Sequence, residues 1–499
     1  MNKQASPAKS RQPEGYSRRR FLRHLSALSA VSVVGFDPVS RNWLTTARAS
    51  AASMGNLPSI EGMLIVEGPV LTDFAHDQGR HVERRPLAVL KPASVRDIQA
   101  MVEYANRHQL KIAMRGRGHS HFGQSLVEGG IVIDSTTLIQ VKMAGADRVD
   151  AEPGATWGEV NETTLSAGRT PAVMPDTMET VTVGGTLNVG GLGETSHHFG
   201  AIVDNVEEVD VVTGDGRLVT CSSAHESELF EMALAGLGQC GLIVRARLKL
   251  VPAPSHVVRQ ELVYDNLDAF IADSSRLVLD RRFDYQRMAT APKHVAAGRF
   301  TMILSKACGA EQNVDLKALL AGLEFRSAAP PARVSYRDYL WRNGQRDRDM
   351  YLKMPDPTLR RAPTTLFVPA SRVREFAAKN LPSLADSAPA LSFGMWPVNV
   401  RRCTRPLLKL PREEVAFGFW IFRNATAGTP GYAELLDSNR ALFEQARDCG
   451  GKSYTPYGPA KASKDWPEHY EPQTWTRLTN AKKKFDPNGV LTPGPNIFA

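Results

Sequence analysis

The sequence lacks the short motifs of several common function classes. It has no Cys-x-x-Cys pair, which leaves zinc ribbons and thioredoxin chemistry unsupported, and no Gly-x-Ser-x-Gly elbow or P-loop. No stretch reaches the roughly 18 apolar residues that a membrane helix needs, so we expect no membrane span. With 42% hydrophobic and 23% charged residues, the 499-residue chain is instead typical of a folded protein with a sizeable core.

Cysteine is scarce as well. The five cysteines are an odd number, so at least one is free or pairs between chains, and they make a poor disulfide framework. We expect most of them to be small buried apolar residues. They are Cys221, Cys240, Cys308, Cys403 and Cys449.

Excess positive charge is confined to the N-terminus. The net charge is +9, but residues 1–49 contain nine Lys or Arg and two acids, a net +7, which leaves +2 for residues 50–499. A nearly neutral body argues against a nucleic-acid partner, because binding a polyanion needs clustered positive charge.

Residues 1–49 resemble a secretory signal. Ser17-Arg18-Arg19-Arg20-Phe21-Leu22 precedes a stretch without Asp, Glu, Lys or Arg from His24 to Phe36, and Ala47-Arg48-Ala49 is an A-x-A cleavage site. The paired arginines before Phe-Leu resemble the twin-arginine export signal, which predicts a periplasmic or secreted protein. The alternative is a disordered basic tail with a weak helix. Twin-arginine export carries folded proteins, so this route suggests a cofactor inserted before export.

The body begins with a strand-helix-strand pattern, after an irregular lead-in over residues 50–80. The helix over 94–108 carries apolar residues at helical spacing, and the whole pattern indicates an α/β arrangement. Pro252 and Pro254 mark a boundary, and residues 255–445 show no motif. The predicted strands are 88–90, 111–114, 131–134, 206–212, 218–220 and 242–250, with a turn at 214–216 and a second helix at 226–235.

Three glycine-rich loops, at 115–125, 183–193 and 236–241, carry the functional signal. Glycines let backbone N–H groups approach a pyrophosphate closely. The first loop lacks the spacing and the following helix of a dinucleotide fingerprint. Each loop alone is more typical of a turn, but three in one α/β domain, one with a His and a Ser at its tip, favour a ligand site.

These residues resemble the flavin-binding domain of the vanillyl-alcohol-oxidase superfamily, and within it the cytokinin dehydrogenases. Arg115-Gly116-Arg117-Gly118-His119-Ser120, with Gly123-Gln124, is similar to the family's R-G-x-G-H-S-x-x-G-Q, and Thr182–Asn188 is similar to its T-V-G-G-T-L-S. Further similar blocks lie at 208–214 and 236–246. The last fifty residues agree too, at 454–457, Trp466, His469, Trp475, 484–487 and 491–498.

The resemblance implies an α+β fold of two parts. A two-subdomain FAD-binding domain of the PCMH type would be built from residues 50–254 and 446–499. Residues 255–445 would form an α+β substrate cap, with an antiparallel sheet and helices on one face. FAD would be the cofactor, and no metal is expected.

The resemblance also implies a covalent flavin. His119 would bond to the C8-methyl group of the ring, with His121 as the competing residue. A His119 that only hydrogen-bonds loop backbone is the alternative. No Cys stands at the second attachment site of bicovalent relatives, where this chain has residues 190–193, so a single bond is expected.

Further cofactor contacts are carried over residue by residue. Asn188 and Pro495 replace a family Ser and Gln, so those two contacts are only partly kept. The pyrophosphate and ring contacts would be Met114, Gly116, Arg117, Gly118, Ser120 and Gln124; Thr182, Asn188 and Leu192 would follow along the second loop; Ile243 would pair with adenine through its backbone; and Tyr454, Thr492 and Pro495 would close the site.

Substrate oxidation needs a proton acceptor beside the flavin N5. The family's Asp precedes T-V-G-G in a W-T-D-Y-L stretch, and Asp176 is the corresponding residue, one position further away and without the Trp and Tyr. Glu179 is the second candidate, and a plain turn residue after Pro175 is the alternative for Asp176. His197-His198 lack partners at metal-ligand spacing, and we expect a solvated loop there. Solvated faces are likewise expected at Arg401-Arg402 and Lys482–Lys484.

Three functions follow as hypotheses. The first is an exported FAD-dependent oxidoreductase that resembles cytokinin dehydrogenase and oxidises a C–N bond of an amine by hydride transfer to flavin N5. The second is an oxidase of an alcohol, sugar or hydroxy acid on the same scaffold. The third is an exported flavin-binding protein without turnover. The expected partners are a small-molecule substrate and O2 or a quinone-like electron acceptor, and the sequence leaves the oligomeric state open.

Overall fold

A computed structural model describes residues 57–288, 298–351, 358–386, 392–459, 461 and 463–498, together with the strands β1 (Val33–Asp37) and β2 (Asn42–Thr45). These two strands pair antiparallel within the segment predicted to be a leader. The twin-arginine residues and the predicted cleavage site lie outside the described residues. In the described part of the chain, no helix has both the length and the apolar character to cross a bilayer.

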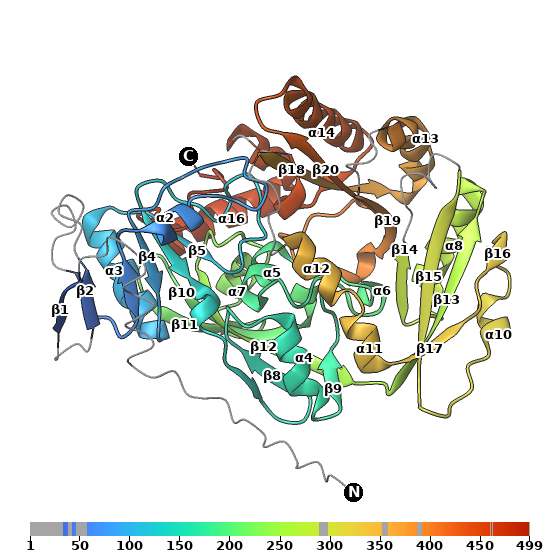
Figure 1. Cartoon of the computed structure of the whole chain (residues 1–499), viewed down its shortest axis with the longest axis horizontal. Coiled ribbons are helices and arrows are strands. Elements are labelled where there is room, and N and C mark those ends of the chain that lie inside the picture. Colours follow the sequence, from blue (N-terminus) through green and yellow to red (C-terminus); the bar gives the residue numbers. More distant parts are fainter. Residues whose placement is uncertain are drawn as a thin grey trace, which may run out of the picture.

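The first sheet has the order β3-β4-β6-β5 and contains the predicted strand-helix-strand unit (Figure 1). Its last three strands run parallel, while β3 is antiparallel to β4. The apolar face of α3 packs on this sheet and buries Ile98, Met101 and Val102 completely. The lead-in is more regular than predicted, since it contains β3 and α2. The elements are β3 (Met63–Ile65), α2 (Pro69–Asp73), β4 (Ala88–Lys91), α3 (Val95–His108), β5 (Ile112–Arg115), β6 (Ile131–Asp134) and η2 (Ser135–Thr137).

The second sheet is antiparallel, with the order β11-β10-β12-β8-β7 and with β9 paired to β12. Its core includes Trp157 and Phe230, both buried. The predicted strands and turn are confirmed to within two residues at each end. The elements are β7 (Val141–Met143), β8 (Arg148–Ala151), α4 (Trp157–Leu165), β9 (Arg169–Pro171), α5 (Val183–Val189), α6 (Ser196–Phe199), η3 (Ile202–Asn205), β10 (Val206–Val212), β11 (Leu218–Ser222), α7 (Ser227–Ala233) and β12 (Leu242–Pro252).

The middle of the chain forms the cap, on the right of Figure 1, from two antiparallel sheets. Their orders are β14-β15-β13-β16, with β17 also paired to β13, and β19-β20-β18-β21. The helices α8, α13 and α14 share one core with both sheets, around Phe270, Val373 and Leu442. The α+β fold with an antiparallel cap is therefore confirmed.

The cap elements are β13 (His256–Tyr264), α8 (Leu267–Asp280), β14 (Tyr285–Met288), β15 (Phe300–Cys308), α10 (Leu316–Leu320), β16 (Ser327–Ala328), β17 (Ala332–Ser335), α11 (Tyr336–Trp341), α12 (Gly344–Tyr351), β18 (Leu359–Pro369), α13 (Ala370–Asp386), β19 (Ser392–Asn399), η4 (Val400–Arg402), β20 (Val415–Thr426) and α14 (Pro430–Asp448).

The C-terminal segment joins both parts. Its first strand, β21, pairs with β18 of the cap, whereas the chain beyond α16 returns to the first sheet. There Ile112 donates its N–H to Val490 O at 2.8 Å and accepts from Thr492 N at 2.7 Å. The elements are β21 (Lys452–Ser453), η5 (Thr455–Tyr457), η6 (Ser463–Asp465), α15 (Trp466–His469) and α16 (Pro472–Phe485).

The cysteines follow the prediction. All five are free, and Cys221, Cys240 and Cys308 are buried. Burial raises the pKa of the Cys221 and Cys240 thiols to about 12, so both stay protonated at neutral pH.

A buried ion pair anchors the returning C-terminus. The prediction that Lys482 is solvated is wrong, because its side chain and that of Asp486 are only 9% and 0% exposed, with Nζ 2.6 Å from Oδ2. Lys482 also donates to Gln239 O at 3.0 Å and Leu491 O at 3.1 Å, while Asp486 accepts from the backbone N–H groups of Val490 and Leu491. This pair ties α16 to the third glycine-rich loop.

We predict that Lys482→Met lowers the free energy of unfolding by about 3–5 kcal/mol, because it leaves the Asp486 carboxylate buried without its cation. Chemical denaturation measures the change. The neighbouring Lys483 is exposed, so Lys483→Met is the matched control and should change stability by no more than about 0.5 kcal/mol. Equal stabilities of the two variants would contradict the anchoring role.

Candidate active site

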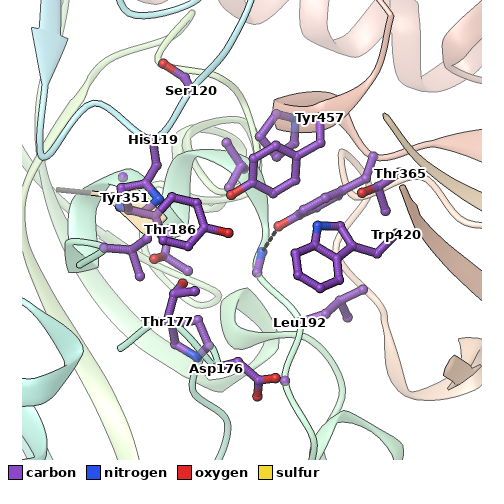
Figure 2. A pocket seen from close by; sticks show the side chains of 18 of the residues that line it. His119, Ser120, Asp176, Thr177, Thr186, Leu192, Tyr351, Thr365, Trp420 and Tyr457 are labelled. Atoms are coloured by element: carbon purple, nitrogen blue, oxygen red, sulfur yellow. Dashed lines mark hydrogen bonds between the residues drawn. The ribbon is translucent and has the colours of Figure 1, made fainter. Parts of the chain in front are cut away.

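A cavity of about 730 Å³ lies where the glycine-rich loops meet the cap. This volume is in the range of ligand pockets, roughly 300–1,000 Å³. Figure 2 shows side chains from both parts pointing into it, with His119 and Asp176 on one side and Trp420 and Thr365 on the other. The cavity therefore brings together residues that are up to 381 positions apart, from Met114 to Pro495.

Most of the predicted site residues line this cavity. Two do not: Ile243 is buried in β12, although the preceding Leu242 reaches the cavity, and Glu179 lies outside it. The lining residues are Met114, Gly116, Arg117, Gly118, His119, Ser120, Gln124, Asp176, Thr182, Asn188, Leu192, Tyr454, Thr492 and Pro495.

The first loop is shaped by positive backbone angles and by a buried carboxylate. Gly118 and Gly123 both have φ of +74°, a conformation that favours glycine. The carboxylate of Asp77, 3% exposed, accepts from Gly123 N at 2.9 Å and from His81 N at 2.8 Å. Gln124 reaches the C-terminal segment, donating to Thr455 O at 2.7 Å.

The second loop is more regular than its glycine content predicted. Its first half is the helix α5, capped by Thr182, whose side chain accepts from Gly185 N at 3.3 Å. The threonine cap supports this short helix despite its glycines and its β-branched residues. Gly184 is needed for packing, because an added Cβ would lie 2.7 Å from Pro153 Cβ.

The third loop and the C-terminus hold each other. Gln239 donates to Thr492 O at 2.9 Å, and the Thr492 hydroxyl donates to Gly238 O at 3.0 Å. Leu237 N donates to Asn188 O at 2.9 Å, which joins the third loop to α5. The three loops and the C-terminal segment thus form one cradle that lines the cavity.

His119 is the histidine that faces the cavity. Neither of its ring nitrogens has a hydrogen-bond partner among the described residues. Burial lowers the pKa of His119 to about 4, so its imidazole is neutral at pH 7. His121 is fully buried, outside the cavity lining, with its ring centroid 5.7 Å from that of Tyr457. The geometry favours His119 over His121 as a cofactor ligand.

Asp176 lies on the cavity wall beside the cap. Its side chain is 40% exposed and lines both the main cavity and a neighbouring one of about 680 Å³. Desolvation at the cavity wall raises the pKa of Asp176 although part of its side chain is exposed, and the negative charge of Glu194 adds to the rise, against nearby guanidinium groups. Burial acts in the same direction on Glu194, but two guanidiniums and the Tyr339 hydroxyl hold its pKa below the ordinary value.

The environments of these two carboxylates therefore differ. Glu194 is kept ionised by its partners, while the pKa of Asp176 is raised and its carboxylate lines the cavity. Such a divergence of pKa values is typical of a residue that performs acid–base chemistry next to one that does not.

The second predicted base, Glu179, does not reach the cavity. Its carboxylate is paired with Arg348 of α12, 2.7 Å away. The structure therefore favours Asp176.

The prediction of a solvated loop at His197-His198 is wrong. His197 is 4% exposed, and Nε2 of both histidines lies within 3.0 Å of Phe283 O, just before β14 of the cap. The backbone adds a bond from Gln286 N to Glu194 O at 3.3 Å. These histidines join the cap to the loop that carries them. The described residues contain no cluster of His, Cys, Asp and Glu able to bind a metal ion. Arg401 and Arg402 are exposed, as predicted.

Sequence reasoning missed the cap side of the cavity. The missed residues come from β14, α12, β18 and β20, and no local motif marks them. They include Arg287, Tyr351, Thr365 and Trp420, together with Glu194 and Tyr457. The Tyr351 ring centroid lies 4.5 Å from that of His119, and the Tyr454 hydroxyl accepts from Gly191 N at 3.1 Å.

Comparisons with known proteins agree with this arrangement. A family profile described as "FAD binding domain" matches residues 86–222, and one described as "Cytokinin dehydrogenase 1, FAD and cytokinin binding" matches residues 302–498. The chain is 34% identical over 430 residues to the "Uncharacterized oxidoreductase ORF5 in fasciation locus" of Rhodococcoides fascians, covering 85% of this chain and 96% of that protein.

Plant proteins are similar over the same length. The chain is 30% identical to "Cytokinin dehydrogenase 7" of Oryza sativa subsp. japonica, covering 90% of this chain and 95% of the relative. It is 29% identical to "Cytokinin dehydrogenase 1" of Arabidopsis thaliana, covering 87% and 83%.

The residues present fit FAD. The unpaired ring nitrogens of His119 and the buried, unpaired Oδ1 of Asn188 both belong to residues that line the cavity, where a ligand would satisfy them. The loops also approach one another as closely as a backbone cradle requires. An added Cβ on Gly116 would lie 2.3 Å from the Thr182 hydroxyl oxygen, which is closer than atoms can come.

We predict that Gly116→Ala reduces the flavin retained by the purified protein by at least tenfold, because the new methyl group forces the first loop away from Thr182. The ratio of flavin to protein absorbance measures it. Gly431, where an added Cβ meets nothing closer than 3.9 Å, supplies the control Gly431→Ala, which should retain full flavin. Full retention by Gly116→Ala would show that this contact is dispensable.

Proposed function

Because the chain belongs to the cytokinin dehydrogenase family of FAD-dependent oxidoreductases, we propose that it oxidises a C–N bond of an adenine-type amine. The observation that carries the proposal is the placement of Asp176. Its carboxylate, with a raised pKa, faces the same cavity as His119 and the glycine-rich cradle. A proton acceptor thus lies between the cofactor loops and the cap.

Bound FAD and Asp176 would each perform one part of the reaction, the removal of hydride and the removal of a proton. When bound, FAD supplies a two-electron oxidant for the substrate's C–H bond. Asp176 accepts the proton of the adjoining N–H group, which makes the departure of hydride from carbon easier. The aromatic and apolar cap residues, among them Trp420 and Tyr351, exclude water from the reacting bond. O2 or a quinone-like acceptor then reoxidises the enzyme.

We further propose that His119 bonds covalently to the flavin. A neutral imidazole is the nucleophilic form, and the lowered pKa of His119 ensures that form at pH 7. Export by the twin-arginine route is also part of the proposal, supported by Arg18-Arg19-Arg20-Phe21-Leu22 and by the basic charge confined to residues 1–49.

Anaerobic reduction of the flavin by a panel of compounds tests the proposed reaction. An N6-alkyladenine should bleach the flavin, while simple alcohols and sugars should not. Bleaching by alcohols or sugars alone would assign the enzyme to C–O oxidation. No bleaching by the panel, with a flavin that dithionite still reduces, would indicate a binding protein without turnover.

We predict that Asp176→Asn slows flavin reduction by the amine by about 10²–10⁴-fold, the usual contribution of a general base. Stopped-flow absorbance measures the rate. In the wild-type enzyme the rate should fall as pH drops through the pKa of Asp176, because the protonated carboxyl cannot accept a proton. That acid limb should lie above the ordinary Asp value of about 4 and vanish in the variant.

Glu179→Gln is the matched control, since Glu179 is paired with Arg348 outside the cavity. The flavin of this variant should be reduced by the amine at close to the wild-type rate. A slow Glu179 variant beside a fast Asp176 variant would reassign the base.

We predict that the wild-type flavin stays with the protein through acid precipitation, and that the His119→Ala flavin is released into the supernatant. The fluorescence of the two fractions measures it. Release of the flavin from wild-type protein, or its retention by His119→Ala, would exclude the covalent bond at His119.

A further inference from the structure

Arg287 is a cap arginine whose side chain donates no hydrogen bond within the described part of the chain. It stands on β14, lines the cavity, and has a side chain that is 22% exposed. Its Nη1 lies 3.9 Å from Asp176 Oδ2 and 3.9 Å from Glu194 Oε1, too far for a hydrogen bond to either. Its guanidinium donates no hydrogen bond to any described residue, although it has five N–H donors.

The other arginines near this end of the cavity are already engaged. The Nη2 atom of Arg342 lies 2.7 Å from Glu194 Oε1. The same guanidinium donates to Tyr339 O at 2.5 Å and stacks over the Tyr339 ring. Arg259 bonds to Glu261 at 3.3 Å, and Arg346 bonds to Asp347 at 3.0 Å.

Glu194 already has hydrogen-bond donors in Arg342 and in the Tyr339 hydroxyl, which donates to it at 2.5 Å, whereas Arg287 contributes only its charge from 3.9 Å. What remains is the open pair of Asp176 and Arg287, an acceptor and a donor that face the cavity side by side. An acceptor next to a donor matches a ligand that presents a donor next to an acceptor.

The position of Arg287 is set by contacts between the cap and the loops. Gln286, the preceding residue, donates its N–H to Glu194 O at 3.3 Å, and Phe283 O lies within 3.0 Å of His197 and His198. These bonds fix β14 against the loop that carries Glu194. Arg287 is thereby held beside Glu194, with its Nη1 atom 3.9 Å from Asp176 Oδ2.

We propose that Arg287 is a specificity-determining residue that donates to an acceptor atom on the substrate, adjacent to the N–H group that Asp176 deprotonates. The inference rests on the proposed function and assigns to Arg287 the recognition of an acceptor nitrogen on the ring that carries the amine. An amine without that acceptor leaves the guanidinium N–H groups desolvated and without a hydrogen-bond partner, so the site discriminates against it.

The test combines a variant of the protein with deletion of the acceptor from the ligand. The probes are an N6-alkyladenine and its 1-deaza and 7-deaza analogues, in which C–H replaces one of the two ring nitrogens nearest the amine. Dissociation constants come from anaerobic titration of the flavin spectrum, for the wild-type protein and for Arg287→Met. Arg326→Gln, at an ion pair whose arginine is 56% exposed and outside the cavity, is the control.

Arg287→Met should weaken binding of the parent amine by about 10–100-fold, the usual contribution of a charge-assisted hydrogen bond. One deaza analogue should bind the wild-type protein more weakly than the parent amine does, by the same factor. Arg287→Met should not weaken the binding of that analogue any further. Arg326→Gln should bind all three as the wild type does. If Arg287→Met does not fold, Arg287→Lys, which keeps the charge but loses the planar fork, should show a smaller loss with the same selectivity.

Equal weakening of all three probes by Arg287→Met, or no weakening, overturns the role of Arg287 and leaves the proposed reaction standing. Arg287-dependent binding without flavin reduction overturns the proposed reaction alone. Failure of the parent amine to bind the wild-type protein overturns both.

Discussion

The site depends on chain segments that approach glycine residues more closely than a Cβ atom would allow. At three junctions a glycine stands where a Cβ would collide. Gly116 meets Thr182, Gly238 meets Thr492, and Gly494 would place a Cβ 2.3 Å from Gly123 O. These junctions join the first loop to the second, the third loop to the C-terminus, and the C-terminus back to the first loop. Segments distant in the chain are thereby closed around a single cavity.

The closed cradle explains why the two parts of the protein have different tasks. The loops supply backbone groups and the unpaired imidazole of His119, which suit a large cofactor that stays bound. The cap supplies Arg287 and Trp420, which face what remains of the cavity. Asp176 belongs to the loop side but lies against β14, so the group proposed to move a proton is positioned by one part of the protein and influenced electrostatically by the other.

The sequence predicted the residues of the cradle well because they belong to motifs that can be recognised within a short stretch of the chain. Glycines at fixed spacing, alternating strands and the His119-Ser120 tip are readable residue by residue, and the expected cofactor residues line the cavity, apart from Ile243. The cap side was not predictable, because Arg287 and Trp420 lie in ordinary strands and acquire meaning only through the pairing of distant segments.

The burial of two polar side chains was also not predictable from the sequence. Lys482 and His197 look like solvated residues in the sequence, yet both are buried. Lys482 donates to the Gln239 carbonyl, 243 positions away, and Nε2 of His197 lies 3.0 Å from a carbonyl oxygen 86 positions away. Burial of a polar group is a tertiary property: it requires a partner that local pattern does not reveal.

The most direct test of the account is the nucleotide content of the protein purified after expression in cells. Denaturing mass spectrometry and absorbance together should find one FAD per chain, because all four segments line the same cavity. A colourless protein that carries no flavin, although it is folded by circular dichroism, would contradict the central claim that these segments close around FAD.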